Sequence, residues 1–514
     1  MALLRSVATV GGYTMMSRVL GFVRDMLTAQ FLGAGPAADA FFIAFRLPNL
    51  FRSFFAEGAF SAAFVPLFAG GMAQHGRLLA KRFAEDALSS LTAVLFVFLL
   101  VCEAAAPALI HLLAPGFAAD PAKFQLTVEL SRITFPYLLF ISLVALQGGI
   151  LTSVERFAAV AATPVLLNLF MIGVLLGVRP VSGQALSWAV TAAGFAQFVW
   201  LLVSCHRAGL TLHFPRPRLT PEVKRLVRLM VPGVFGAGVT QLNLVVSTAV
   251  ASLLPTGAVS YLYYADRLNQ LPLAVVGIAV GTAILPPLSR QLRLKDEKGA
   301  VNSQNRGLEL ALLLTLPAAV ALGMAAKPIL LVLFQRGQFG PAETAATAAA
   351  LTAYAAGLPA FVLVKVLAPA FFARQDTVTP VKVALASMAT NLVLTLVLGL
   401  ALPFAQTGIA CATSAAGWVN AALLLGVLHR RGHFALDRRC RSRIPRIVAS
   451  SILMGLAVWA LTFLLAPWLA SGLALRLAAL AVLVGGGLAV FACLALVLGA
   501  AEWGEVRRRL GRAS

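Results

Sequence analysis

Charged residues are scarce in this chain. Only 12% of its 514 residues are Asp, Glu, Lys or Arg, about half the share with which a soluble protein covers its surface. Hydrophobic residues make up 60% of the sequence. This composition excludes a soluble globular protein and is typical of an all-α integral membrane protein that crosses the bilayer many times.

Cysteine is equally sparse. The five cysteines are scattered, and no CxxC spacing occurs, which argues against a disulfide framework and a zinc site. The sequence also lacks the acidic pair beside a large loop that a membrane-embedded glycosyltransferase would need. We therefore expect neither an enzyme nor a bound cofactor. A cleavable signal peptide is not expected either, because the first apolar run is too long and contains arginines.

Apolar runs long enough to cross a bilayer recur along the whole chain. About fourteen spans are predicted, in two groups of six and a final pair, at 7–32, 38–71, 85–112, 125–152, 157–178 and 183–204, then 229–253, 257–289, 307–334, 343–372, 379–402 and 407–428, and finally 447–468 and 473–500. Basic linkers precede the seventh and the thirteenth span.

The net charge of +22 suggests nucleic-acid binding at first sight, but the positions of the basic residues argue against it. They gather in every second loop, and seven arginines lie between Arg430 and Arg446. This alternation is the positive-inside pattern of a multi-pass membrane protein. It predicts that both termini are cytoplasmic and that nucleic acid is not a partner.

The first half of the chain resembles the second at a fixed offset. "AFRLPNL" at 44–50 matches "ADRLNQL" at 265–271, and both are displaced by 221 residues. We predict two six-helix lobes in the same orientation, at 1–220 and 221–430, followed by a region at 431–514 with the basic linker, a helix pair and a cytoplasmic tail. Parallel repeats of this kind are typical of transporters, whose binding sites lie between the repeats.

The most informative residues are the charges inside the predicted spans. An arginine at the centre of a membrane helix costs about 2.5–3.5 kcal/mol, so these side chains are expected to line a water-filled cavity between the lobes. They are Arg18, Arg24, Asp25, Asp39, Arg46, Arg52, Glu57, Asp266 and Arg267, with Lys365 further along. Two interpretations stay open, because Asp25 and Asp39 lie seven residues from Arg18 and Arg46 and the pairs would neutralise each other.

An anion site is the alternative to simple pairing. Arg18, Arg24, Arg52 and Arg267 have few compensating acids, and the planar guanidinium suits phosphate because it donates two parallel hydrogen bonds. Gly21 and Pro48 are positions where bends in the first two spans would bring these arginines together.

Several long motifs resemble the MurJ (MviN) family of lipid II flippases, which act in peptidoglycan synthesis and belong to the multidrug/oligosaccharidyl-lipid/polysaccharide exporter superfamily. The resemblance covers nearly the whole chain, and the motifs are "SRVLGFVRD", "ADAFFIAFRLPNLFRSFFAEGAFSAAFVPLF", "YYADRLNQLPLAVVGIAVGTAILPPLS", "LFQRGQF" and "KVLAPAFFARQDTVTPVK".

The resemblance implies a function and a location. Lipid II, an undecaprenyl-pyrophosphate-linked disaccharide-pentapeptide, would be flipped from the cytoplasmic to the periplasmic leaflet of the bacterial inner membrane by alternating access. Arg18, Arg24, Arg52 and Arg267 would engage its pyrophosphate, and Asp39 would be functionally important. Ser17, Asp25, Arg46, Glu57, Asp266 and Lys365 are secondary candidates. Membrane lipids and cell-wall synthesis proteins are the expected partners of a monomer.

The resemblance also bears on the lipid tail and the energy source. The last two spans would hold the polyprenyl tail, and "VGGGLAV" at 484–490 either leaves room for it or serves helix packing. Some relatives bind Na⁺ through an aspartate at the position of Ser247, where a serine makes a sodium site doubtful. The membrane potential or an ion gradient is the expected driving force. Rival interpretations are an exporter of another polyprenyl-linked saccharide or of drugs, and a scaffold that binds lipid II without moving it.

Overall fold

Two compact groups of helices make up the protein. The computed structural model describes residues 2–55 and 59–501. One unit comprises residues 1–260 with 336–339, and the other comprises 261–335 with 340–514. The contacts thus group the seventh predicted span with the first unit, whereas the repeat-based division at 220 stays a prediction. Within the described residues no strand forms, and one isolated β-bridge joins Arg336 and Phe339.

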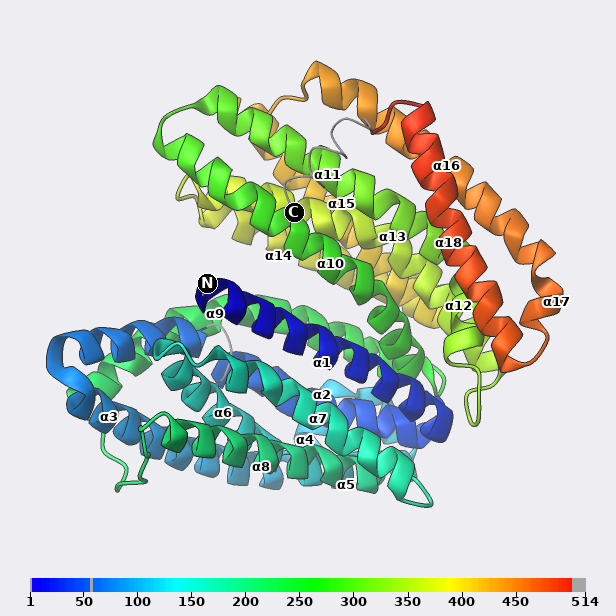
Figure 1. The fold of residues 1–514 in the computed structure, drawn as a ribbon. Helices are drawn as coiled ribbons and strands as arrows, with labels where there is room; N and C mark the ends of the chain where they lie inside the picture. The colour runs from blue at the N-terminus through cyan, green and yellow to red at the C-terminus, as the bar shows by residue number, and fades with distance from the viewer. Residues whose placement is uncertain (1, 56–58, 502–514) are drawn as a thin grey trace. The chain divides into compact units, whose positions relative to one another are not determined.

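The first unit is a bundle of antiparallel helices (Figure 1) in which α1 packs along α7, α6 along α8, and α2 on α5. Its elements are α1 (Ala2–Leu32), α2 (Pro36–Phe55), α3 (Ala59–Ala104), α4 (Ala106–Leu113), a 3-10 turn (Pro115–Ala119), α5 (Pro121–Thr134), α6 (Pro136–Ser153), α7 (Phe157–Gly177), α8 (Gly183–Arg207) and α9 (Pro221–Ser252).

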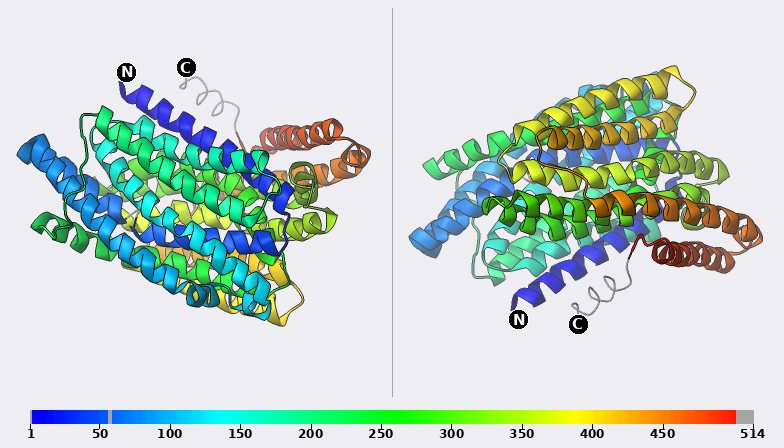
Figure 2. Two further views of the ribbon diagram at one scale, coloured as in Figure 1. Left: turned by 90° about the horizontal axis from the view of Figure 1, so that it is seen from below. Right: turned by 90° about the horizontal axis from the view of Figure 1, so that it is seen from above.

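The second unit is built around α13, which packs against α11 and α15. Two further helices, α16 and α18, lie side by side in both views of Figure 2. Its elements are α10 (Ala258–Arg293), α11 (Glu297–Met324), α12 (Ala326–Leu333), α13 (Pro341–Phe372), α14 (Val378–Leu396), a π-helical turn (Val397–Ala401), α15 (Ala405–Arg430), α16 (Arg438–Leu464), α17 (Ala466–Leu469) and α18 (Leu473–Val497).

The helix boundaries confirm the internal repeat. At the 221-residue offset, α7 begins at Phe157 and α14 at Val378. The starts of α4 at Ala106 and of α12 at Ala326 differ from this offset by one residue. The short helices α4 and α12 therefore recur as equivalent elements. The fold is two pseudo-repeated sets of helices followed by the C-terminal pair α16 and α18.

The predicted count of fourteen helices is not confirmed, because prolines divide several spans. The spans at 85–112, 125–152, 307–334 and 447–468 each become two helices, with Pro107, Pro136, Pro328 and Pro467 at the breaks. Proline lacks the backbone N–H that a helix needs and clashes with the preceding turn. Conversely, the expected loop at 72–84 is helical on both sides of Gly76, where two helical segments of α3 meet at a kink. The φ of 78° at this residue suits glycine.

Ten of the described helices are long and apolar enough to cross a membrane, which makes this a multi-pass membrane protein. The helices α1, α2, α9 and α10 are not among the ten. These four are related in pairs by the repeat. Three of them, α1, α2 and α10, carry the charges that the sequence singled out.

The motif "ARQDTVTP" forms the connection between α13 and α14. Both oxygens of Asp376 accept hydrogen bonds from Thr379, from its backbone N–H at 2.9 Å and its hydroxyl at 2.6 Å, and Arg431 donates to the same carboxylate at 2.6 Å. Chiefly through the Thr379 hydroxyl, these contacts hold the pKa of Asp376 well below its usual range. The motif therefore starts α14 and ties it to the residues after α15.

We expect the Asp376→Asn variant to melt at a lower temperature than the wild type at pH 7, and this difference to narrow as the pH falls below about 4. A carboxylate whose pKa is depressed by folding contributes stability above its unfolded pKa and loses it as the pH falls toward the folded value. The measurement is intrinsic fluorescence during heating of the purified protein. A difference that stays constant down to pH 2.5 would contradict this assignment.

Candidate functional site

Two polar clusters of the first unit contain four of the predicted site residues. The first cluster joins α1 to α7. Arg24 is buried and forms an ion pair with Asp25 at 2.7 Å, and its other terminal nitrogen donates to the Oδ1 of Asn168 at 3.1 Å. The amide of Asn168 donates in turn to the backbone carbonyl of Ser17 at 2.9 Å. Ser17, Arg24 and Asp25 are thus brought together through Asn168.

Asn168 was not predicted from the sequence, although a signal was present. It is a polar side chain in the middle of the apolar run "VLLNLFMIG". A carboxamide in a membrane helix is costly unless it bonds to a neighbouring helix. It meets α1 beside Gly21, where an added Cβ would lie 3.5 Å from the Asn168 amide nitrogen. The helix α1 is continuous through Gly21, so glycine here provides a close approach rather than the predicted bend.

The second cluster surrounds Asp39 at the start of α2. Its side chain is buried, and Lys123 of α5 lies 2.8 Å from one carboxylate oxygen. The same oxygen accepts from the Gly257 N–H at 2.8 Å, and the other accepts from the N–H and hydroxyl of Ser260 at 3.0 and 2.6 Å. Four donors therefore satisfy this carboxylate within the first unit.

This geometry corrects one predicted pairing. Asp39 pairs with Lys123 rather than with Arg46, whose guanidinium donates instead to the hydroxyl of Thr248 on α9. Lys123 lies outside the predicted spans, but it is buried and its Nζ also lies 4.0 Å from the ring centroid of Phe117. A cation held against an aromatic face and a carboxylate loses little by leaving water.

The remaining arginines lie on three helices. Arg18 is exposed on α1, and Arg52 is half-buried near the end of α2, which is continuous through Pro48. In the second unit, Arg267 lies over the Tyr263 ring at 5.0 Å and donates to the tyrosine hydroxyl at 3.1 Å. The joining of Arg267 with the arginines of the first unit stays a prediction.

The secondary candidates are distributed as follows. Asp266 accepts a hydrogen bond from Gln270 one turn later on α10. Lys365 is exposed on α13 and approaches α10 so closely that a Cβ on Gly277 would lie 3.0 Å from its Nζ. Glu57 lies outside the described residues.

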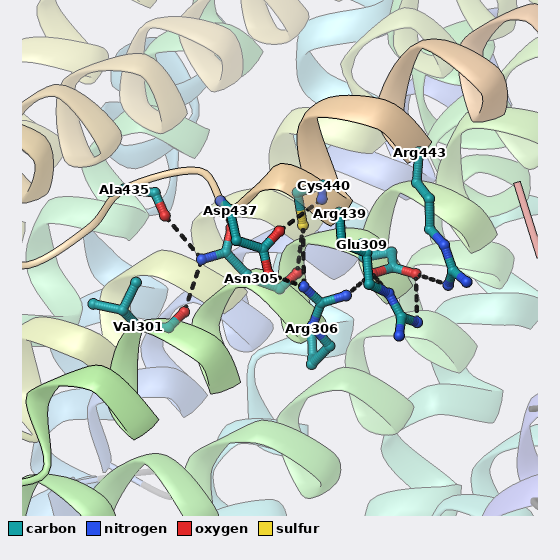
Figure 3. A network of polar contacts seen from close by, with 9 residues as sticks. All are labelled: Val301, Asn305, Arg306, Glu309, Ala435, Asp437, Arg439, Cys440 and Arg443. Atoms are coloured by element: carbon teal, nitrogen blue, oxygen red, sulfur yellow. Dashed lines mark hydrogen bonds and ion pairs between the residues drawn. The ribbon is translucent and has the colours of Figure 1, made fainter.

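The C-terminal pair is attached to α11 by a polar network (Figure 3). Glu309 of α11 is buried, and its carboxylate forms ion pairs with three arginines. These are Arg306 of the same helix, Arg439 at 3.1 Å and Arg443 at 2.5 Å. Asp437 caps the start of α16 by accepting from the Cys440 N–H and also pairs with Arg306. Part of the basic run between Arg430 and Arg446 is therefore an anchor for α16.

The glycines of α18 are consistent with both interpretations that the sequence left open, which are helix packing and room for a lipid tail. A Cβ on Gly487 would lie 3.0 Å from Val458, and one on Gly486 would lie 3.3 Å from Leu461, so these two allow close packing on α16. Gly485 has no such neighbour and leaves open space beside the helix.

Comparisons with known proteins agree with these features. A family model described as lipid II flippase MurJ matches residues 28–479. A probable lipid II flippase MurJ of Rhizobium meliloti (strain 1021) is 46% identical over all of this chain and 97% of its own length. Its counterpart in Vibrio cholerae serotype O1 is 38% identical over 97% of this chain and 96% of its own length.

Solved structures give the same result. One described as lipid II flippase MurJ in an inward closed conformation matches with a TM-score of 0.78 and 25% identity, over 95% of this chain and 98% of its own. An inward-facing multidrug resistance MATE transporter of the MOP superfamily has a TM-score of 0.66 at 13% identity, over 83% of this chain and 98% of its own, and shows a shared fold. The resemblance seen in the sequence is confirmed, and the chain belongs to the MurJ family of lipid II flippases.

Proposed function

We propose that this protein flips lipid II from the cytoplasmic to the periplasmic leaflet by alternating access. The observation that carries the proposal is the family membership over the full chain. The arginines on α1, α2 and α10 support it, because charged side chains inside the helices of a membrane protein need a polar ligand or water to solvate them.

The arginines are proposed to bind the pyrophosphate. Arg18 is exposed and Arg52 half-buried, whereas Arg24 is engaged by Asp25 and Asn168. A bound pyrophosphate would replace Asp25 as the anion opposite Arg24, so that one anion is exchanged for another. Such an exchange costs less than freeing a buried guanidinium. Asp39, whose acceptor positions are filled, is proposed to act through its contacts rather than by touching the ligand.

Location and energy source belong to the same proposal. The loop charges support a bacterial inner-membrane protein with both termini in the cytoplasm. A monomer that needs no cofactor is part of the same proposal. The membrane potential or an ion gradient is proposed to drive the cycle, since an elementary charge crossing the membrane is worth about 2.3 kcal/mol per 100 mV. A sodium site at Ser247 is not favoured, because a serine hydroxyl is a weak, uncharged ligand for a hard cation.

A complementation experiment tests the arginines. We expect Arg18→Ala, Arg24→Ala, Arg52→Ala and Arg267→Ala each to abolish growth in cells depleted of their own lipid II flippase, at unchanged membrane levels of the variant. Arg46→Ala is the matched control, and we expect it to impair growth less than the other four substitutions. The guanidinium of Arg46 already donates a hydrogen bond to the hydroxyl of Thr248. Normal growth of all four variants would refute the anion site.

Lipid binding separates this function from its rivals. Native mass spectrometry of the purified protein should show selection of lipid II over undecaprenyl phosphate and over an ordinary phospholipid, and the Arg24→Ala, Arg267→Ala double variant should lose it. Movement of lipid II by the protein in vesicles then excludes a scaffold that only binds. Indifferent binding of all three lipids would instead favour another cargo.

A further inference from the structure

A polar cavity lies in the first unit, away from the clusters of Arg24 and Asp39. Its volume is about 410 Å³, and it opens where the start of α1, the turn between α6 and α7, and the end of α8 meet. Its lining includes Tyr13 from α1, Arg156 from the turn, and Trp200 and Arg207 from α8. The family comparison and the proposed flippase site leave this cavity without a role.

The cavity carries excess positive charge. Arg156 and Arg207 are both exposed, and within the described part of the chain neither guanidinium has a recorded hydrogen bond or ion pair. Glu155 also contributes to the lining, so the three charged side chains sum to one positive charge. Two unengaged guanidiniums at one cavity are suited to bind a phosphate, which accepts several hydrogen bonds at once.

The fold holds these walls in place. Glu155 has a left-handed backbone with φ of 60°, and the Arg156 N–H closes the turn by donating to the Leu151 carbonyl at 2.8 Å. The indole N–H of Trp200 donates to the Ala159 carbonyl at 3.0 Å, which fixes the ring between α8 and α7. The cavity is therefore shaped by backbone contacts.

An apolar stripe leads along α8 toward the cavity. Trp188, Phe195, Val199 and Val203 are exposed and recur at helical spacing. Arg207 follows one turn later, at the end of the helix. In a membrane protein such a stripe faces acyl chains, and the arginine at its end lies at headgroup level. The positive-inside pattern assigns this end to the cytoplasmic side.

We propose that this cavity binds the phosphate of an anionic phospholipid of the cytoplasmic leaflet. Arg156 and Arg207 contact the phosphate, Tyr13 and Trp200 lie at the interface between headgroup and acyl chains, and the chains run along the α8 stripe. Free inorganic phosphate has the same chemistry and is the other source of such an anion. The proposal is independent of lipid II transport.

The test uses Trp200 as a reporter in the full-length protein. The protein is placed in phosphatidylcholine nanodiscs with increasing brominated phosphatidylglycerol, whose bromine quenches a tryptophan in contact. A Trp200→Phe variant defines the share of the signal that comes from Trp200. We expect this share of the fluorescence to be quenched at low phosphatidylglycerol content. The Arg156→Gln, Arg207→Gln double variant should need at least about tenfold more phosphatidylglycerol to reach the same degree of quenching.

Two controls make the result specific. Arg216→Gln, Arg228→Gln removes two exposed arginines outside the cavity and is expected to leave the quenching unchanged. Arg156→Lys, Arg207→Lys keeps the charge and should retain most of the binding. Equal quenching by brominated phosphatidylcholine, or an unchanged midpoint in the glutamine variant, would overturn the proposal. Binding of inorganic phosphate that depends on Arg156 and Arg207, measured by calorimetry, together with no quenching by brominated phosphatidylglycerol, would identify free phosphate as the ligand and overturn the lipid assignment.

Discussion

Replacing Asp39 with asparagine is expected to destabilise the first unit by about 3–5 kcal/mol, the cost of breaking a buried ion pair from one side. The substitution leaves the ammonium of Lys123 buried without its counter-ion. It also turns an amide NH₂ toward donors, because the N–H groups of Gly257 and Ser260 and the Ser260 hydroxyl already point at this side chain. The measurement is the unfolding of the purified variant, followed by intrinsic fluorescence.

A double-mutant cycle isolates the pair. Adding Lys123→Met to Asp39→Asn removes the stranded charge and should restore part of the lost stability, so that the two effects are not additive. Ser260→Ala removes one hydrogen bond and should cost only about 1 kcal/mol. If Asp39→Asn folds as stably as the wild type yet fails to support growth, the carboxylate acts on the ligand directly and its assignment as a buried structural anion is wrong.

Glu309→Gln is the second substitution with a large expected effect. This buried carboxylate is the shared ion-pair partner of Arg306, Arg439 and Arg443, of which Arg443 is itself only 5% exposed. Removing its charge takes a counter-ion from the buried guanidinium of Arg443, at a cost of about 3–5 kcal/mol. Because Arg439 and Arg443 belong to α16, we expect the C-terminal pair to loosen from α11. Faster proteolysis within 431–437, before α16, would report it.

The same substitution elsewhere on α11 provides the control. Glu297 pairs with Arg374 at 2.7 Å, but its side chain is 57% exposed. Glu297→Gln should therefore cost less than about 1 kcal/mol and leave proteolysis before α16 unchanged. Equal cleavage rates in Glu309→Gln and the wild type would show that apolar contacts, such as those of Met454 and Val458 with α11 and α12, are sufficient to hold the pair.

The sequence by itself determined the class of fold, the repeat and the family. Lipid imposes a length and an apolar composition on each span, and the repeat preserves spacing, so these features are local and can be read along the chain. The same argument identified Arg24, Asp39 and Arg46 as charges that need partners. It did not predict that the chain stays helical up to Gly76 and again after it, because these helical segments extend beyond their apolar stretches.

Only the tertiary structure decided which partners the charges take. Asp39 meets Lys123, which is 84 residues away, and Arg24 meets Asn168, which is 144 residues away. Helical periodicity relates residues a few turns apart and contains no information about such distant contacts. The function of the basic run before α16 was likewise decided by packing, since a positive-inside signal and an anchor for a buried glutamate use the same arginines. In a membrane protein, the lipid bilayer determines which segments form membrane-spanning helices, because it imposes their length and apolar composition. The packing of those helices determines which buried charges pair with one another.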